Sequence, residues 1–357
     1  MIKPLISLAA TLALVAPLSA QDAVAPPFPS PNEIVGEAPA SDWVAIAPEN
    51  LLVMTLAPAA DNSPREVVLQ LIGEPFAQGW VANIRTLARA GWYDGNTINR
   101  VQDNYVVQWG DPNYDNPEAD GAAKPLPAGL VATDEADYTV PLSIGPSTAH
   151  EVFAVSAVQR SQWIRSLAEQ GILPDNEQIE KAMARQKGDS YAIETMFIDG
   201  WPVGMGVDFE AVPEPISWPL HCYGMVGVGR GMSPDAGSGA ELYTVNGHAP
   251  RHLDRNIALV GRIVSGMEHL TSLPRGSGAL GFYTAEEADL RTPIVSVRLA
   301  SDMAAGEAPR FEYLSSASKA FARYADARAN RRDPFFIVPA GGADICNIPV
   351  PVRRVAE

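Results

Sequence analysis

The sequence predicts a mainly β protein, and three strand-like patterns carry that prediction. Two apolar runs, 50–56 and 65–72, are joined by a turn-rich segment, as in a β-hairpin. Apolar and polar residues then alternate between a turn at 94–95 and a second turn at 110–112, which is the period of a half-buried strand. A strand, a loop and a further strand are predicted across 224–245.

The composition indicates a globular chain with an acidic surface. Hydrophobic residues make up 46% and aromatic residues 8% of the 357 residues, which is enough to bury a core. Lysine and arginine total 26 against 42 aspartate and glutamate residues, so the formal net charge is −16. Such a charge argues against nucleic acid and anionic membranes as the main partners.

The N-terminal residues have the layout of a secretory signal peptide. A short charged start, 1–3, precedes the apolar run 5–18, and we expect cleavage after Ala20. A membrane anchor is the alternative, but the run is shorter than a full span and contains Pro17. We therefore expect a periplasmic or secreted protein that is not inserted in a membrane after cleavage.

The rest of the chain divides into a lead-in, a main domain and an extension. The lead-in at 21–42 follows the signal peptide at 1–20, and its Pro/Ala-rich composition predicts an extended, weakly structured segment. The main domain is predicted at 43–300 with an insertion at about 113–219, and the extension covers 301–357. We expect the insertion to project from the domain and to be removable without loss of the fold. Helical spacing and capping signals predict helices at 75–90, 148–171, 175–187 and 316–330.

The stretch 93–112 is the most specific part of the sequence. It reads Tyr-Asp-Gly-x-Thr-x-x-Arg-Val, followed by an aromatic residue and Gln-x-Gly-Asp-Pro. This order resembles the signature of the cyclophilin-type peptidyl-prolyl isomerases, and 220–300 is similar to the second half of that family. The resemblance covers about half of the chain. It implies a closed eight-stranded antiparallel barrel capped by helices, here with a partly helical insertion and a C-terminal extension.

Prolyl isomerisation places modest chemical demands on a protein. Rotating a peptide bond costs about 18–20 kcal/mol, because resonance of the nitrogen lone pair is lost. A catalyst must favour the twisted bond, in which the prolyl nitrogen accepts a hydrogen bond, and must hold the ring in an apolar slot. We therefore expect no metal and no cofactor, and proline-containing polypeptides as substrates.

The resemblance also implies a set of site residues. Arg100 would donate to the prolyl nitrogen, and Gln108 would orient Arg100. The residues matching the family's substrate-binding positions are Tyr105, Val106, Gly229, Arg230, Glu241, Tyr243, His252 and Leu253. Two simpler interpretations stay open: the apolar members are ordinary barrel core, or Arg100 is an edge-strand arginine in a surface ion pair.

Several positions depart from the family pattern. Asn99 replaces the histidine before the arginine, and Ile257 stands where a pocket histidine is frequent. Glu241 stands where glutamine is usual, and its carboxylate is expected to attract Arg100 and compete with substrate. These departures put full activity in question more than they question the fold.

The two cysteines, Cys222 and Cys346, can either form a disulfide in an exported protein or remain buried as thiols. They are too few and too far apart in the sequence for a zinc site. The leading hypothesis is an exported peptidyl-prolyl cis-trans isomerase that acts on Xaa-Pro bonds and assists folding. The rival hypothesis is a catalytically weak or inactive cyclophilin-like module that binds proline-containing segments.

Overall fold

The structure is a computed structural model of the 357-residue chain. It describes residues 28–114, 116–142, 152–154, 171, 189–208, 214–338 and 340–355. The predicted signal peptide at 1–20 and the predicted helix at 175–187 lie outside these residues.

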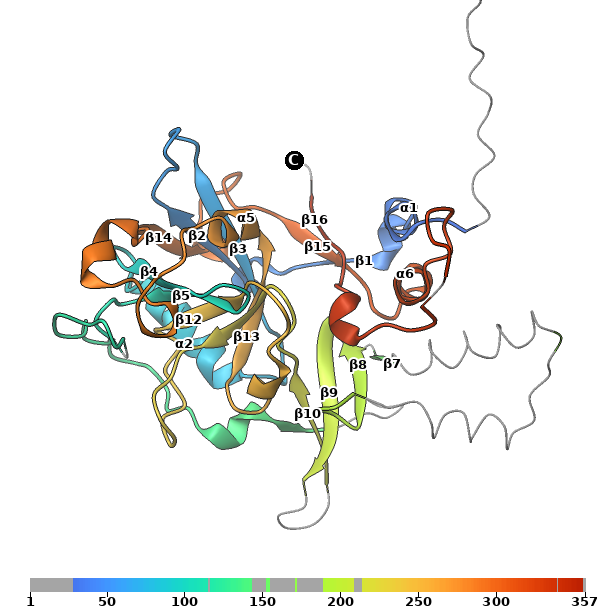
Figure 1. Ribbon diagram of the computed structural model, residues 1–357, viewed down its shortest axis with the longest axis horizontal. Helices are drawn as coiled ribbons and strands as arrows, with labels where there is room; N and C mark the ends of the chain where they lie inside the picture. Colours follow the sequence, from blue (N-terminus) through green and yellow to red (C-terminus); the bar gives the residue numbers. More distant parts are fainter. Residues whose placement is uncertain are drawn as a thin grey trace, which may run out of the picture.

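An eight-stranded antiparallel sheet forms the main body of the protein (Figure 1). It curves into a nearly closed barrel, which confirms the predicted mainly β fold. The strands, in the order of their hydrogen-bonded neighbours, are β14 (Ile294–Leu299), β2 (Leu51–Leu56), β3 (Arg65–Leu71), β13 (Leu259–Ser265), β11 (Met225–Val228), β12 (Leu242–Val245), β5 (Val106–Gly110) and β4 (Thr97–Val101).

The two end strands of this sheet, β4 and β14, meet through backbone hydrogen bonds. The N–H of Ile294 donates to the carbonyl of Asn96 at 2.8 Å, and the N–H of Ile98 donates to the carbonyl of Thr292 at 2.9 Å. These bonds occupy polar groups that an open sheet edge would leave unpaired.

The stretch predicted as one half-buried strand is a hairpin of two strands, β4 and β5, with Asn104 in the turn at φ 51°. All of β5 is buried, although the alternation predicted one exposed face. Val107 and Trp109 belong to the main core, whereas Val106 belongs to a separate apolar cluster on the other face of the strand. An alternating pattern therefore marks two different buried environments here.

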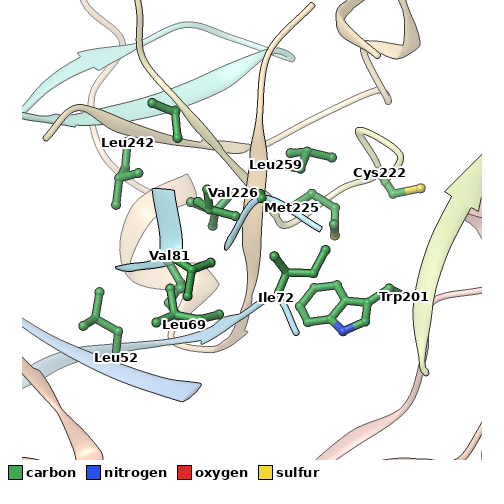
Figure 2. Close-up of a cluster of buried hydrophobic side chains, with 14 of the residues drawn as sticks. Leu52, Leu69, Ile72, Val81, Trp201, Cys222, Met225, Val226, Leu242 and Leu259 are labelled. Carbon is green, nitrogen blue, oxygen red and sulfur yellow. The ribbon is translucent and has the colours of Figure 1, made fainter. Parts of the chain in front are cut away.

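In the described part of the chain, α2 (Gln78–Arg89) is the longer of two helices that pack against the barrel. Its buried face includes Trp80, and the indole N–H donates to the carbonyl of Gly237 at 2.9 Å. Figure 2 shows Val81 of α2 together with Leu69 of β3 and Val226 of β11 in the main core. The shorter helix is α5 (Met267–Thr271).

In the described ranges the insertion forms a second sheet of five strands and the short 3-10 helix η3 (Glu135–Tyr138). Residues 152–154 of the predicted helix at 148–171 form a strand of this sheet, because pairing with the neighbouring strand overrides the helical spacing there. Apart from Gly171, the rest of that predicted helix lies outside the described residues. The neighbouring strands, in order, are β6 (Val140–Pro141), β10 (Glu214–Pro219), β9 (Trp201–Asp208), β8 (Glu194–Ile198) and β7 (Val152–Ala154).

This second sheet shares its core with the barrel. Phe197, Trp201 and Trp218 are each less than 10% exposed and belong to the same hydrophobic cluster as the barrel interior. Figure 2 shows the Trp201 ring beside Ile72 of the barrel. Such packing argues against the expectation that the insertion can be removed without loss of the fold, since each large side chain contributes about 1.5–3 kcal/mol by burial.

The two ends of the described chain come together in a third sheet (Figure 1). Its strand order is β1 (Trp43–Ala45), β15 (Phe311–Leu314) and β16 (Val352–Arg354). Helix α6 (Lys319–Ala329), predicted at 316–330, packs against α1 (Pro31–Gly36).

The lead-in at 21–42 was expected to be extended, but its described part includes α1. Ser30 and Glu33 form a capping box at the start of this helix, and Ile34 is buried against the core. Proline at the first helical position is compatible with a helix, so the proline-rich composition was misleading at this point.

A disulfide ties the C-terminal extension to the barrel. Cys222 and Cys346 are bonded, with their Cα atoms 5.0 Å apart and 124 residues apart in sequence. Closing so long a loop stabilises a fold by about 2–4 kcal/mol in typical cases.

Arg262 of β13 lies where the three sheets meet. Its Nε donates to Oε1 of Gln70 at 2.8 Å and its Nη1 donates to the carbonyl of Gly200 at 2.8 Å. The guanidinium lies 4.5 Å from the ring centre of Trp201 and 5.7 Å from that of Tyr313. Burial lowers the pKa of Arg262 to about 10, so the side chain is still a cation at neutral pH.

Short 3-10 helices connect these elements. They are η1 (Ala40–Asp42), η2 (Pro48–Asn50), η3 (Glu135–Tyr138), η4 (Arg251–Leu253), η5 (Ala279–Gly281), η6 (Ala285–Leu290), η7 (Ala300–Asp302) and η8 (Ile345–Asn347). Within the described ranges, no helix has the length and apolar character needed to span a membrane.

Candidate active site

The hairpin of β4 and β5 places Arg100 directly opposite Gln108. Nη1 of Arg100 donates to Oε1 of Gln108 at 3.3 Å, and Nε donates to the carbonyl of Leu280 at 2.7 Å. Nη2 donates to Oε1 of Gln102. The predicted partnership of Arg100 and Gln108 is therefore present in the geometry.

All three acceptors around Arg100 are uncharged. Among the described residues Arg100 makes no ion pair with a carboxylate, which leaves its charge uncompensated at short range. Burial lowers the pKa of Arg100, while Tyr105 and Tyr243 oppose that shift. The guanidinium stays charged at neutral pH, because an arginine side chain is not deprotonated in proteins under these conditions.

Two aromatic rings flank the guanidinium. Its central carbon lies 5.6 Å from the ring centre of Tyr105 and 5.4 Å from that of Phe282. These cation–π contacts, with the three hydrogen bonds, hold the plane of the group. A guanidinium has five N–H groups, so two remain for a ligand beside these described contacts.

The predicted pocket residues come together in one apolar cluster. Val106, Tyr243 and Val245 are buried in it. Tyr105, Leu253 and Ile257 pack against them and are only partly buried. Pairing of β5 with β12 produces this arrangement, since it sets Tyr243 opposite Gln108 and Val245 opposite Val106.

His252 is exposed and lies beside the cluster. Its ring is parallel to that of Tyr105, with 6.2 Å between ring centres and 4° between the planes. The predicted site residues Arg100, Gln108, Tyr105 and His252 therefore form one continuous surface with the apolar cluster.

A buried polar chain that the sequence did not predict runs behind this cluster. The Tyr243 hydroxyl lies 2.8 Å from Nε2 of His221, and Nδ1 of His221 lies 2.9 Å from Oδ1 of Asp254. Arg251 donates from Nε to Oδ2 of Asp254 at 2.5 Å and from Nη1 to Oδ2 of Asp189 at 2.7 Å. We call these five residues the polar relay. It joins the pocket to the segment where the insertion returns to the barrel.

Burial determines the protonation of the relay. It lowers the pKa of His221, although Asp254 opposes that shift, and it raises the pKa of Tyr243 well above its ordinary value. A carboxylate only accepts hydrogen bonds, so Nδ1 of neutral His221 donates to Asp254 and Nε2 accepts from the Tyr243 hydroxyl. The hydroxyl is thus held away from the pocket, and the apolar ring lines it.

The carboxylate of Glu241 is directed under Gly110. Its Oε1 accepts from the backbone N–H of Asp111 at 2.6 Å, and the side chain is 2% exposed. A Cβ atom on Gly110, whose φ is 150°, would lie 2.1 Å from Oε1. Glu241 was expected to compete with substrate for Arg100, but none of the hydrogen bonds given above for these two residues joins them.

Three other sequence-predicted positions have mainly structural partners. Nε of Arg230 donates to the carbonyl of Asn256 at 3.0 Å, and the N–H of Gly229 donates to the carbonyl of Glu241 at 2.8 Å. Asn99 is 1% exposed, and its Nδ2 donates to the carbonyl of Gly110 at 3.0 Å. Asparagine at this position therefore supports the hairpin.

The fold and this surface define a class of protein: a nearly closed β-barrel with a cation beside an apolar cluster on its outer wall. The chain belongs to the cyclophilin-type peptidyl-prolyl cis-trans isomerases, because the family model described as cyclophilin type peptidyl-prolyl cis-trans isomerase/CLD matches residues 66–298. It is accordingly an enzyme of the peptidyl-prolyl cis-trans isomerase class.

Comparison with solved structures gave matches that include two cyclophilins. The crystal structure of cyclophilin AquaCyp293 from Hirschia baltica has a TM-score of 0.57 and 20% sequence identity, over 87% of this chain and 93% of that chain. A cyclophilin type peptidyl-prolyl cis-trans isomerase from Cryptosporidium parvum, crystallised in the presence of the dipeptide Ala-Pro, has a TM-score of 0.33 and 8% identity. That comparison covers 69% of this chain and 98% of the other. No curated protein matches the chain.

Proposed function

We propose that this enzyme isomerises Xaa-Pro bonds in exported proteins and thereby assists their folding. The observation that carries the proposal is the position of Arg100, a cation with uncharged acceptors, beside the apolar cluster of Tyr105 and Tyr243. The proline ring lies in the cluster, and a free N–H of Arg100 faces the prolyl nitrogen.

The proposed mechanism stabilises the twisted peptide bond. In the planar bond the nitrogen lone pair is delocalised, so Arg100 gains little by donating to it. As the bond twists, the lone pair localises and becomes an acceptor, and the hydrogen bond strengthens. Gln108 fixes the guanidinium plane for that moment. No bond is made or broken in the substrate.

Export is proposed from the N-terminal sequence and the cysteines. The charged start, the apolar run 5–18 and Ala20 have the order of a signal peptide. A bonded pair of cysteines, Cys222 and Cys346, suits a compartment such as the periplasm, where disulfides persist. N-terminal sequencing of the protein recovered from the cell exterior or periplasm tests this part, and a chain that begins at Met1 there contradicts it.

The activity is tested with a protease-coupled assay on a peptide that contains one Xaa-Pro bond. We expect the mature protein to speed cis-to-trans conversion well above the uncatalysed rate, which has a time of roughly 10–100 s. A second assay follows the proline-limited refolding of a disulfide-free exported protein. Binding of the peptide without any acceleration supports the rival function, a module that only holds proline-containing segments.

A further inference from the structure

A cleft of about 640 Å³ opens beside the predicted proline pocket. Tyr105 and His252 line this cleft and also border the pocket, so the two are continuous. We call it the flanking cleft. Its walls come from the β4–β5 turn, residues 189–191 of the insertion, the loop at 247–252 and residues 344–347 of the C-terminal extension.

Fixed links hold the two walls that lie outside the barrel. Nη1 and Nη2 of Arg251 donate to the two carboxylate oxygens of Asp189 at 2.7 and 3.0 Å, which anchors the insertion side. The disulfide of Cys346 with Cys222 anchors the extension side. A cleft with walls fixed in this way binds a ligand without a large ordering cost.

The cleft offers exposed aromatic rings. Tyr223 is 56% exposed and Tyr191 is 47% exposed. Arg251 lies 5.4 Å from the ring centre of Tyr191. Exposed tyrosine rings bind the stems and cationic heads of basic side chains and also stack with aromatic ones.

The charge around the cleft is negative. The lining holds two carboxylates, Asp189 and the exposed Asp344, against one guanidinium, Arg251. This leaves an excess of one negative charge at the cleft wall, in a chain with a net charge of −16. A basic side chain is therefore favoured in the cleft over an acidic one.

We propose that the flanking cleft is a specificity subsite, which binds the residues next to the proline in the same polypeptide and prefers lysine or arginine there. The proposal rests on the proposed function, because the bound segment must extend from a proline in the adjacent pocket. The ligand is an extended, basic, proline-containing segment of an unfolded protein.

The test compares peptides and variants by kcat/KM. A short peptide contains only the residues next to the proline, and longer peptides carry lysine, serine or glutamate on both sides of the same core. Two variants change the cleft: Asp344→Asn, which keeps the acceptor that caps η8, and Tyr223→Ser at an exposed position. The matched control is Asp61→Asn, which removes the same charge in the loop between β2 and β3, where no residue lines the cleft.

We expect the lysine peptide to have a kcat/KM roughly three- to tenfold above that of the glutamate peptide at low salt. Both cleft variants bring this ratio toward one, and they change kcat/KM for the short peptide much less. The control variant Asp61→Asn keeps the wild-type ratio. An equal kcat/KM for lysine and glutamate peptides, or a ratio that the cleft variants leave unchanged, overturns the proposal.

A binding assay separates failure of the subsite from failure of the proposed function. If no peptide is isomerised, the enzymatic proposal fails. Fluorescence anisotropy of labelled lysine and glutamate peptides then tests, independently of catalysis, whether the flanking cleft prefers the basic peptide. Tighter binding of the lysine peptide, weakened by Asp344→Asn and Tyr223→Ser, supports the subsite. Equal binding of the two peptides contradicts it.

Discussion

Two arginines near the apolar cluster have partners of different charge, and this difference shows how one residue type can be held in two ways. Arg100 is half-buried and donates to uncharged oxygens of Leu280, Gln102 and Gln108. Arg251 is 5% exposed and binds the carboxylates of Asp189 and Asp254. The carboxylates compensate the charge of Arg251, and they raise its pKa despite the opposing effect of burial. Among the described residues, Arg100 has no carboxylate partner, whereas Arg251 links Asp189 to Asp254.

The largest expected effect on stability is that of Arg251→Ala. This change leaves the carboxylates of Asp189 and Asp254 buried without their cation, and breaking a buried ion pair costs about 3–5 kcal/mol. Urea unfolding of the mature protein measures the free energy of unfolding. Arg100→Ala is the matched control, with a loss of no more than about 1 kcal/mol because no carboxylate is left unpaired. Equal losses for the two variants would remove the distinction between the two arginines.

Tyr243→Phe tests how much the buried polar relay contributes to stability. It removes the hydroxyl that donates to Nε2 of His221 and leaves that buried nitrogen without this partner. We expect the free energy of unfolding to fall by about 1–3 kcal/mol. Adding His221→Leu removes the unpaired nitrogen, so a double-mutant cycle should give a coupling between the two residues. If the decreases in the free energy of unfolding are additive, the hydrogen bond between Tyr243 and His221 contributes little to stability in solution.

The free energy of unfolding should also depend on pH, because the polar relay contains the buried His221. The unfolded chain protonates His221 near its ordinary pKa of 6.5, whereas burial lowers the pKa of His221 in the folded protein. The unfolded state then binds more protons, so the free energy of unfolding is highest above that value and falls as the pH drops below it. We expect His221→Gln to show a smaller loss than the wild type between neutral and mildly acidic pH. Identical slopes would show that His221 is not the group responsible.

The smallest expected effect is that of Glu241→Gln. A carboxylate bonded to Arg100 would suppress activity, and its removal would raise kcat/KM. In the structure Oε1 of Glu241 accepts from the N–H of Asp111, and a glutamine oxygen can do the same. We therefore expect kcat/KM to stay within about twofold of the wild-type value. A clear increase would show that Glu241 does restrain Arg100 in solution.

The sequence predicts the Arg100 side of the pocket well, for a physical reason. Arg100, Tyr105 and Gln108 lie within one hairpin, so local spacing fixes their relative positions. The barrel strands are similarly marked by short apolar runs between turns. The helix α1 carried a readable signal, the capping box of Ser30 and Glu33, but the proline-rich composition outweighed it.

The polar relay was not predictable in the same way. Arg251 and Asp254 are three residues apart in the sequence, but His221, Tyr243 and Asp189 come from separate segments, and only the folded chain brings them to this pair. No spacing rule relates residues 62 positions apart, such as Asp189 and Arg251. The direction of the Glu241 side chain was equally hidden, because it depends on the space that Gly110 leaves. The packing of Phe197, Trp201 and Trp218 of the insertion against the barrel was hidden for the same reason, since it is a tertiary property.

The role of Arg100 is tested most directly by comparing catalysis and binding in Arg100→Ala. Measurements of kcat/KM on a Xaa-Pro peptide and of the Kd for the same peptide, for the wild type and the variant, separate the twisted state from the ground state. We expect kcat/KM to fall by about 2–4 kcal/mol of lost transition-state stabilisation, and the Kd to change far less. Arg100→Lys should recover little, because a point charge cannot contact Gln108 and the prolyl nitrogen together. A wild-type kcat/KM in Arg100→Ala, or an equal loss in binding and catalysis, would contradict the proposed role of this arginine.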